Sequence, residues 1–199
     1  DSTLTAALCT QALGKDRVLG VLMPTSFTPE EDVKDALELA HTLGIRTTRV
    51  DIDPICKALT AALGVSENDP KCRISLANLR ARIRMVVLYY YANSLNYLVA
   101  GTGDRSEALI GYFTKYGDGG ADFFPIQHLY KTQVRELLEH IGIPERLAQK
   151  PSSPQLYPGH KLSDELPLNY DKLDYVLAGL FDLRLSPEKV SGTTEVPLD

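Results

Sequence analysis

The chain has 199 residues, 44% of them hydrophobic and 24% charged, which suits one folded domain with a buried core. A net charge of −5 disfavours the broad basic surface that nucleic acid requires, so any anionic ligand must be held by local cations. Apolar runs stay shorter than the roughly 20 residues of a membrane helix, and we expect neither nucleic acid nor membrane as a partner.

The chain opens on Asp1 and Ser2, directly before a helical pattern of apolar residues from 4 to 13. A helix that opens in this way normally follows a loop and, in an α/β domain, a strand. It ends at Asp199, where a further element could begin. We therefore expect a single domain, residues 1–199, that is cut at both ends.

Strand and helix signals alternate through the first half. Thr28 and Glu31 match a capping box with Pro29 at the first helical position, which predicts a helix from there to Gly44. Periodicity in the rest of this half predicts strands at 18–23, 45–52 and 97–100, and helices at 55–63 and 75–96.

The second half predicts helices at 130–141 and 171–181, with a Pro-, Ser- and Gly-rich loop beginning at Lys150. Helices that alternate with short apolar strands are typical of a parallel sheet covered on both sides. The sequence thus predicts an α/β fold, a doubly wound parallel sheet with helices on both faces. Cys9, Cys56 and Cys72 are widely spaced, which favours a reducing, cytoplasmic setting over zinc or disulfides.

The segment from Gly101 to Ile126 is the main candidate for a binding site. It is rich in glycine, follows a predicted strand, and contains cations beside the carboxylates of Asp104, Glu107, Asp118 and Asp122. Open α/β sheets bind ligands just outside the carboxyl ends of their strands. The pattern predicts a site for an anionic ligand, with carboxylates available for a metal.

Several motifs resemble the NAD synthetases, which belong to the ATP pyrophosphatase group (adenine nucleotide alpha hydrolase-like fold). NxxARxRM starts at Asn78, GTxxxxE spans Gly101 to Glu107, and GYFTKYGDGGxD spans Gly111 to Asp122. The last of these is highly specific. The family's SGGxDS phosphate loop is represented only by Asp1 and Ser2.

The resemblance implies an ammonia-dependent ligase that amidates deamido-NAD to NAD, with ATP as co-substrate and Mg²⁺ as cofactor. The nicotinate carboxylate would attack ATP, giving an adenylylated intermediate and pyrophosphate, and ammonia would then displace AMP. The resemblance also implies a homodimer joined through long helices.

The same resemblance assigns roles to residues of this sequence. The metal ligands would be Asp1 and Glu107. ATP would contact Ser2, Thr102, Lys131 and Ser153, although Ser152 also fits the last position. Deamido-NAD would contact Arg82, Lys115 and Asp122.

Two other readings remain open at this level. One is another ATP pyrophosphatase amidotransferase, such as a GMP synthetase, which would share the Asp-Ser remnant but not the GYFTKYGDGG block. The other is a nucleotide-binding module without catalysis, which would not need Lys115, Asp122 and two metal-binding carboxylates together.

Overall fold

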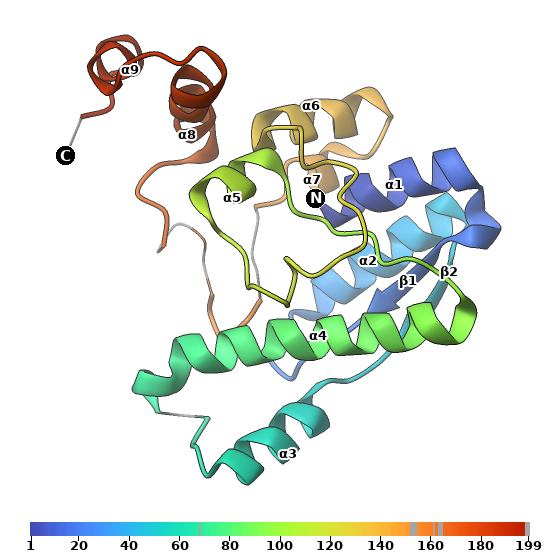
Figure 1. Ribbon diagram of the computed structural model, residues 1–199. Coiled ribbons are helices and arrows are strands. Elements are labelled where there is room, and N and C mark those ends of the chain that lie inside the picture. Colours follow the sequence, from blue (N-terminus) through green and yellow to red (C-terminus); the bar gives the residue numbers. More distant parts are fainter. Residues whose placement is uncertain (68, 152–154, 161, 163–164, 198–199) are drawn as a thin grey trace.

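A computed structural model gives the structure of the chain and describes residues 1–67, 69–151, 155–160, 162 and 165–197 (Figure 1). Its strands are β1 (Leu19–Leu22) and β2 (Arg46–Arg49). Its α-helices are α1 (Ser2–Leu13), α2 (Glu30–Leu43), α3 (Asp53–Leu63), α4 (Arg73–Leu95), α5 (Arg105–Ile110), α6 (Lys131–His140), α7 (Glu145–Ala148), α8 (Tyr170–Leu177) and α9 (Pro187–Thr194). Shorter helical turns are η1 (Lys15–Arg17), η2 (Pro70–Cys72) and the π-helical η4 (Ala178–Asp182).

The sheet is parallel, so the predicted α/β class is confirmed. β1 pairs with β2, with Leu19 opposite Arg46 and Leu22 opposite Arg49. The strand predicted at 97–100 is reduced to one parallel bridge between Ala100 and Phe123. Both β1 and residues 97–100 line one cavity, and the strand that pairs with β1 is β2.

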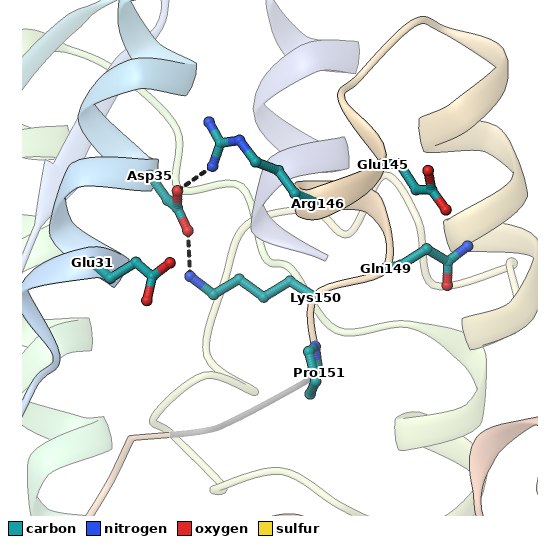
Figure 2. A pocket seen from close by; sticks show the side chains of 7 residues that line it. All are labelled: Glu31, Asp35, Glu145, Arg146, Gln149, Lys150 and Pro151. Carbon is teal, nitrogen blue, oxygen red and sulfur yellow. Dashed lines mark hydrogen bonds and ion pairs between the residues drawn. The ribbon is translucent and has the colours of Figure 1, made fainter.

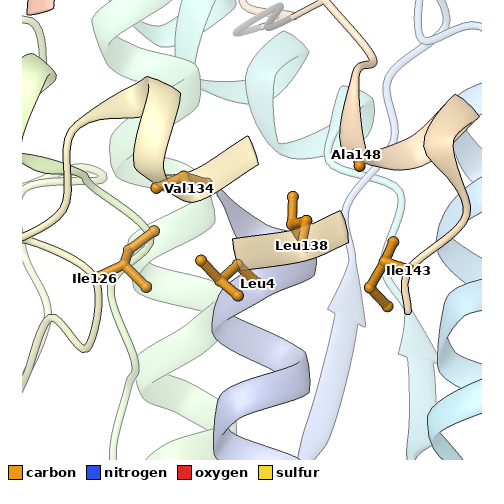
Figure 3. Close-up of a cluster of buried hydrophobic side chains, with 6 residues drawn as sticks. All are labelled: Leu4, Ile126, Val134, Leu138, Ile143 and Ala148. Carbon is orange, nitrogen blue, oxygen red and sulfur yellow. The ribbon is translucent and has the colours of Figure 1, made fainter. Parts of the chain in front are cut away.

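Helices lie on both sides of the strands (Figure 1). On one side, α1, α2, α6 and α7 surround an apolar cluster, which Figure 3 shows in close-up: Leu4, Ile126, Val134, Leu138, Ile143 and Ala148. On the other side, α3 packs on α4 through Ile52, Cys56 and Ile83. A third cluster, of Tyr130, Tyr170, Leu173 and Leu177, joins α8 to the start of α6, and the end of α5 packs against it through Leu109 and Ile110.

The predicted start of α2 is wrong in detail. Pro29 is the N-cap of this helix, and no side chain caps it. The hydroxyl of Thr28 instead accepts the N–H of Thr25 at 3.0 Å, so it is not available to the helix. Threonine side chains commonly bond nearby backbone in this way, in competition with helix capping.

Other elements differ in extent from the prediction. The segment 101–126 contains the helix α5, and α8 continues as the π-helical η4 over the predicted 171–181 range. The helix α9 was not predicted. Within the described residues, none of the helices combines the length and the apolar character needed to cross a membrane.

Candidate active site

A cavity of about 1010 Å³ follows β1 between α1, α2 and α4. Its lining includes Ser2 at the start of α1, Met23 just past the carboxyl end of β1, and Thr102 just past the bridge at Ala100. These are the positions where ligands of parallel sheets bind. The fold therefore brings Ser2 and Thr102, separated by about half of the chain, to the same cavity.

A second recess, of about 490 Å³, lies between α2 and α7 (Figure 2). Its cations already have partners on α2: Arg146 pairs with Asp35 and Glu38 at 2.5 Å each, and Lys150 pairs with Asp35 and, at 2.6 Å, with Asp32. The described lining of this recess includes none of the predicted site residues. We interpret these ion pairs as surface contacts that hold α7 against α2.

Lys131 is the centre of a buried charge cluster. Its side chain is 2% exposed, and its Nζ lies 2.6 Å from Asp1 Oδ2, 2.7 Å from Asp104 Oδ2 and 3.0 Å from Glu107 Oε1. The four residues come from three helix starts, because Asp1 directly precedes α1, Asp104 caps α5 and Lys131 begins α6. Three of the predicted residues, Asp1, Glu107 and Lys131, are thus brought together.

Asp104 was not predicted as a site residue, although its sequence signal was present. Asp104 and Glu107 have capping-box spacing, and the structure forms that box. Asp104 Oδ1 accepts the Glu107 N–H at 2.8 Å, and the Asp104 N–H donates to Glu107 Oε2 at 3.3 Å. The box leaves Asp104 Oδ2 and Glu107 Oε1 directed at Lys131.

Burial and neighbouring charge set the protonation of this cluster. Burial raises the pKa of the Glu107 carboxyl and the charge of Asp104 raises it further, against the lowering effect of Lys131. Burial alone would lower the pKa of Lys131, but the charges of Glu107 and Asp104 raise it above its usual value. Lys131 is therefore a firmly held cation at neutral pH.

The same carboxylates fit a divalent cation. One oxygen from each of Asp1, Asp104 and Glu107 lies within 4.8 Å of the others. Hard oxygen donors of this kind suit Mg²⁺, which binds through a few carboxylates together with substrate phosphates and water. The donor set therefore fits the magnesium that the resemblance implies, and Asp104 is a further candidate ligand.

The residues predicted to contact the dinucleotide lie along α4 and the loop after α5. The Arg82 Nε–H donates to the Lys115 carbonyl at 3.1 Å, which joins these two residues. The carboxylate of Asp122 accepts the Val99 N–H at 2.7 Å and the Tyr89 hydroxyl at 3.1 Å. Asp122 thus fastens the loop to the backbone beside the cavity.

Close packing explains two glycines of this loop. A Cβ on Gly117 would lie 2.9 Å from Thr114 Cγ2, and a Cβ on Gly119 would lie 2.6 Å from Phe113 Cδ2. Contacts this short do not occur for ordinary side chains, so these positions need glycine for lack of space. Ser153 and its alternative Ser152 lie outside the described residues.

Comparisons with known proteins agree with the family resemblance seen in the sequence. The family model described as NAD synthase matches residues 1–199. A relative from Hyperthermus butylicus, named NH(3)-dependent NAD(+) synthetase, is 53% identical over 200 residues, which cover 100% of this chain and 71% of the relative. A relative of the same name from Pyrobaculum aerophilum is 53% identical over 192 residues, covering 96% of this chain and 71% of the relative.

Solved structures agree in fold. NMN synthetase from Francisella tularensis superposes with a TM-score of 0.81 at 30% identity, covering 98% of this chain and 79% of that one. NH3-dependent NAD synthetase from Campylobacter jejuni superposes with a TM-score of 0.73 at 33% identity, covering 98% of this chain and 77% of that one. The predicted resemblance is confirmed: the chain belongs to the NAD synthase family, whose members are ligases that form carbon–nitrogen bonds.

Proposed function

We propose that the protein amidates deamido-NAD to NAD with ammonia, at the expense of ATP. A carboxylate does not react with ammonia at neutral pH, because its oxygen is a very poor leaving group. Transfer of the adenylyl group of ATP onto the nicotinate carboxylate, with release of pyrophosphate, converts that oxygen into part of AMP. Ammonia then attacks the activated carbonyl carbon, AMP leaves, and the amide remains.

The observation that carries this proposal is the cluster around Lys131, seen in a chain of the NAD synthase family. Its work in the reaction is to place the triphosphate and balance its charge, because preorganised charge and orientation are the main means of accelerating phosphate transfer. Lys131 supplies a buried ammonium for this purpose. Ser2 and Thr102, in the cavity lining, supply hydroxyl and backbone groups for ATP.

Asp1 and Glu107, with Asp104, would hold Mg²⁺ in this proposal. The ion would supply positive charge to the triphosphate. The chain's own carboxylates must be ionised to bind it, and the ammonium of Lys131 favours that state by attraction. Ser153 stays a prediction for ATP, from the family motif alone.

The dinucleotide is assigned to Arg82, Lys115 and Asp122. Arg82 and Lys115 lie together and provide cations for its phosphates or carboxylate. Asp122 acts at least by holding the loop in place through Val99 and Tyr89.

We further propose a homodimer joined through α4. Val86 and Tyr90 lie one turn apart on this helix and are 63% and 65% exposed, which leaves an apolar strip for a second copy to cover. A cytoplasmic location accords with three free cysteines, Cys9, Cys56 and Cys72. Light scattering on a sizing column tests the dimer, since a monomer mass at micromolar concentration contradicts it.

The assay for the proposed function mixes the protein with ATP, MgCl₂, ammonium and deamido-NAD, and measures NAD and AMP. We expect equimolar NAD and AMP, with no NAD when ammonium is left out. A parallel reaction contains nicotinic acid mononucleotide in place of deamido-NAD, because one structural neighbour is an NMN synthetase. Turnover of the mononucleotide alone would contradict the assignment of the dinucleotide.

The substitution Lys115→Ala tests the dinucleotide site. Loss of a charge-assisted contact, worth about 1.5–3 kcal/mol, should raise the KM for deamido-NAD by roughly 10- to 150-fold. The KM for ATP should change little. Lys57→Ala, an exposed lysine on α3, is the matched control. An unchanged KM for deamido-NAD in the Lys115 variant would contradict its role.

A further inference from the structure

A carboxylate that none of the site predictions includes lies directly behind the Lys131 cluster. Asp174 on α8 is 5% exposed. Its Oδ1 accepts the Ser106 hydroxyl at 2.5 Å, and its Oδ2 accepts both the N–H and the hydroxyl of Thr132 at 2.8 Å each. A buried carboxylate is tolerated when donors converge on it in this way.

The three donors belong to the two helices that carry the site. Ser106 is the residue before Glu107 on α5, and Thr132 is the residue after Lys131 on α6. The network closes on itself, because the Ser106 Oγ also accepts the Lys131 N–H at 3.0 Å. Asp174 therefore connects the start of α5, which carries Glu107, to the start of α6, which carries Lys131.

The start of α8 adds a second contact to the same lysine. The ring of Tyr170, one turn before Asp174, lies 4.9 Å from the Lys131 Nζ, and Tyr170 is 5% exposed. An ammonium over an aromatic ring is attracted by its electron-rich face. A negative charge at the start of α6 is favourable as well, because helix N-termini carry positive charge. One side of α8 thus forms the back wall of the cluster.

We propose that Asp174 is a positioning residue for the Lys131–Glu107 pair, and this inference rests on the proposed function of that pair. It fixes the start of α6 relative to α5, and so the distance between the ammonium and the carboxylate. A misplacement of about 1 Å at such a site costs about 100-fold in rate. Asp174 is not proposed to touch a substrate.

Asparagine at this position replaces the carboxylate only in part. Its amide has one acceptor oxygen where Asp174 has two, and with that oxygen on Thr132 its NH₂ group faces the Ser106 hydroxyl. The Ser106 hydroxyl proton then loses its acceptor and the negative charge at the start of α6 is gone, so the link between α5 and α6 weakens. Ser106→Ala breaks the same link from the other side with a smaller change.

The experiment measures ATP affinity by calorimetry, with MgCl₂ and without the dinucleotide, and the steady-state kcat and KM. For Asp174→Asn and for Ser106→Ala we expect ATP to bind about tenfold more weakly and kcat to fall about 100-fold, as for a displaced site group. The double variant should lose less than the sum of the two single losses, because the Ser106–Asp174 bond is lost in both. Asp171→Asn is the control: it lies on the same helix, is 67% exposed, and pairs with Arg135 at 3.4 Å.

Thermal unfolding of each variant separates positioning from folding, since all measurements are made well below its transition. If both single variants are folded and keep the wild-type ATP affinity and kcat, Asp174 serves stability alone and the inference is wrong. Additive effects in the double variant would also overturn it. Should the wild-type protein bind ATP but form no NAD, the proposed function fails, while the ATP titrations still decide the role of Asp174.

Discussion

Replacing Lys131 with methionine removes one cation from the centre of three carboxylates. At an effective dielectric constant of about 20, two charges 3 Å apart attract by roughly 5–6 kcal/mol. The variant loses such attractions but no longer has to bury an ammonium. Breaking one side of a buried ion pair costs about 3–5 kcal/mol in net terms. We expect this loss at pH 7, because Lys131 and Asp104 are 2% and 0% exposed and water cannot replace the lysine.

The loss should depend on pH with a definite sign. The folded-state pKa of Lys131 is raised, so its stabilisation is present below the pKa of an unfolded lysine and is lost only as pH rises through the raised value. Between pH 5 and 7 the lysine stays charged in both states. The carboxylates of the variant, however, take up protons more readily, because the pKa of Glu107 is raised by burial even with the lysine present. The destabilisation should therefore be smaller at pH 5 than at pH 7.

Urea unfolding followed by far-ultraviolet circular dichroism, at both pH values, measures the effect. Lys150→Met is the matched control, because Lys150 also pairs with two carboxylates, Asp32 and Asp35, but is 34% exposed. Ion pairs at the surface are worth less than about 1 kcal/mol, so this variant should lose no more than that. The reasoning is refuted if the Lys131 variant is destabilised no more than the control, or equally at both pH values.

Two further predictions follow from the geometry. Gly101→Ala places a Cβ 2.3 Å from the Phe124 ring. The overpacking should lower the free energy of unfolding by about 1–3 kcal/mol, measured as a lower urea midpoint. An unchanged midpoint would show that the ring can move away freely. Binding of Mn²⁺ in the presence of ATP, followed by electron paramagnetic resonance, should weaken as pH falls, because the carboxylates must be ionised to bind the cation and burial raises the pKa of Glu107. Binding that is no weaker at acid pH than at pH 7 contradicts that assignment.

The helices could largely be predicted because each carries its own signal. The apolar spacing along α4 predicted 75–96, and the helix spans Arg73–Leu95. The start of α2 was placed wrongly because Thr28 binds Thr25 instead, a choice between two local bonds that the pattern does not distinguish. The strand at 97–100 was overestimated because pairing depends on a neighbouring strand and cannot be inferred from one apolar run.

The candidate site, too, could be predicted only in part from the sequence. The family motifs identified Lys131 and Glu107, but their meeting at 3.0 Å depends on how α5 and α6 pack. Asp104 has the spacing of a helix cap, and only the fold shows that its second oxygen meets the lysine. Asp122 was predicted as a ligand contact, and its bond to the Val99 N–H joins segments that the sequence alone could not align.

The apolar cluster of Figure 3 holds the first turns of α1 and α6 in place beside the site. Leu4 lies half a turn beyond Ser2, and Val134 lies about one turn beyond Lys131, and both are essentially inaccessible to solvent at 0% and 1%. The first turns of α1 and α6 therefore cannot fray without exposing the middle of the protein. The amide protons of Thr5 and Val134, which donate to the carbonyls of Asp1 and Tyr130 at 2.9 Å each, should therefore exchange slowly with deuterium, as is typical of the most stable units of a fold. Nucleotide binding would then meet groups that are already in place, with little ordering left to be done at that moment.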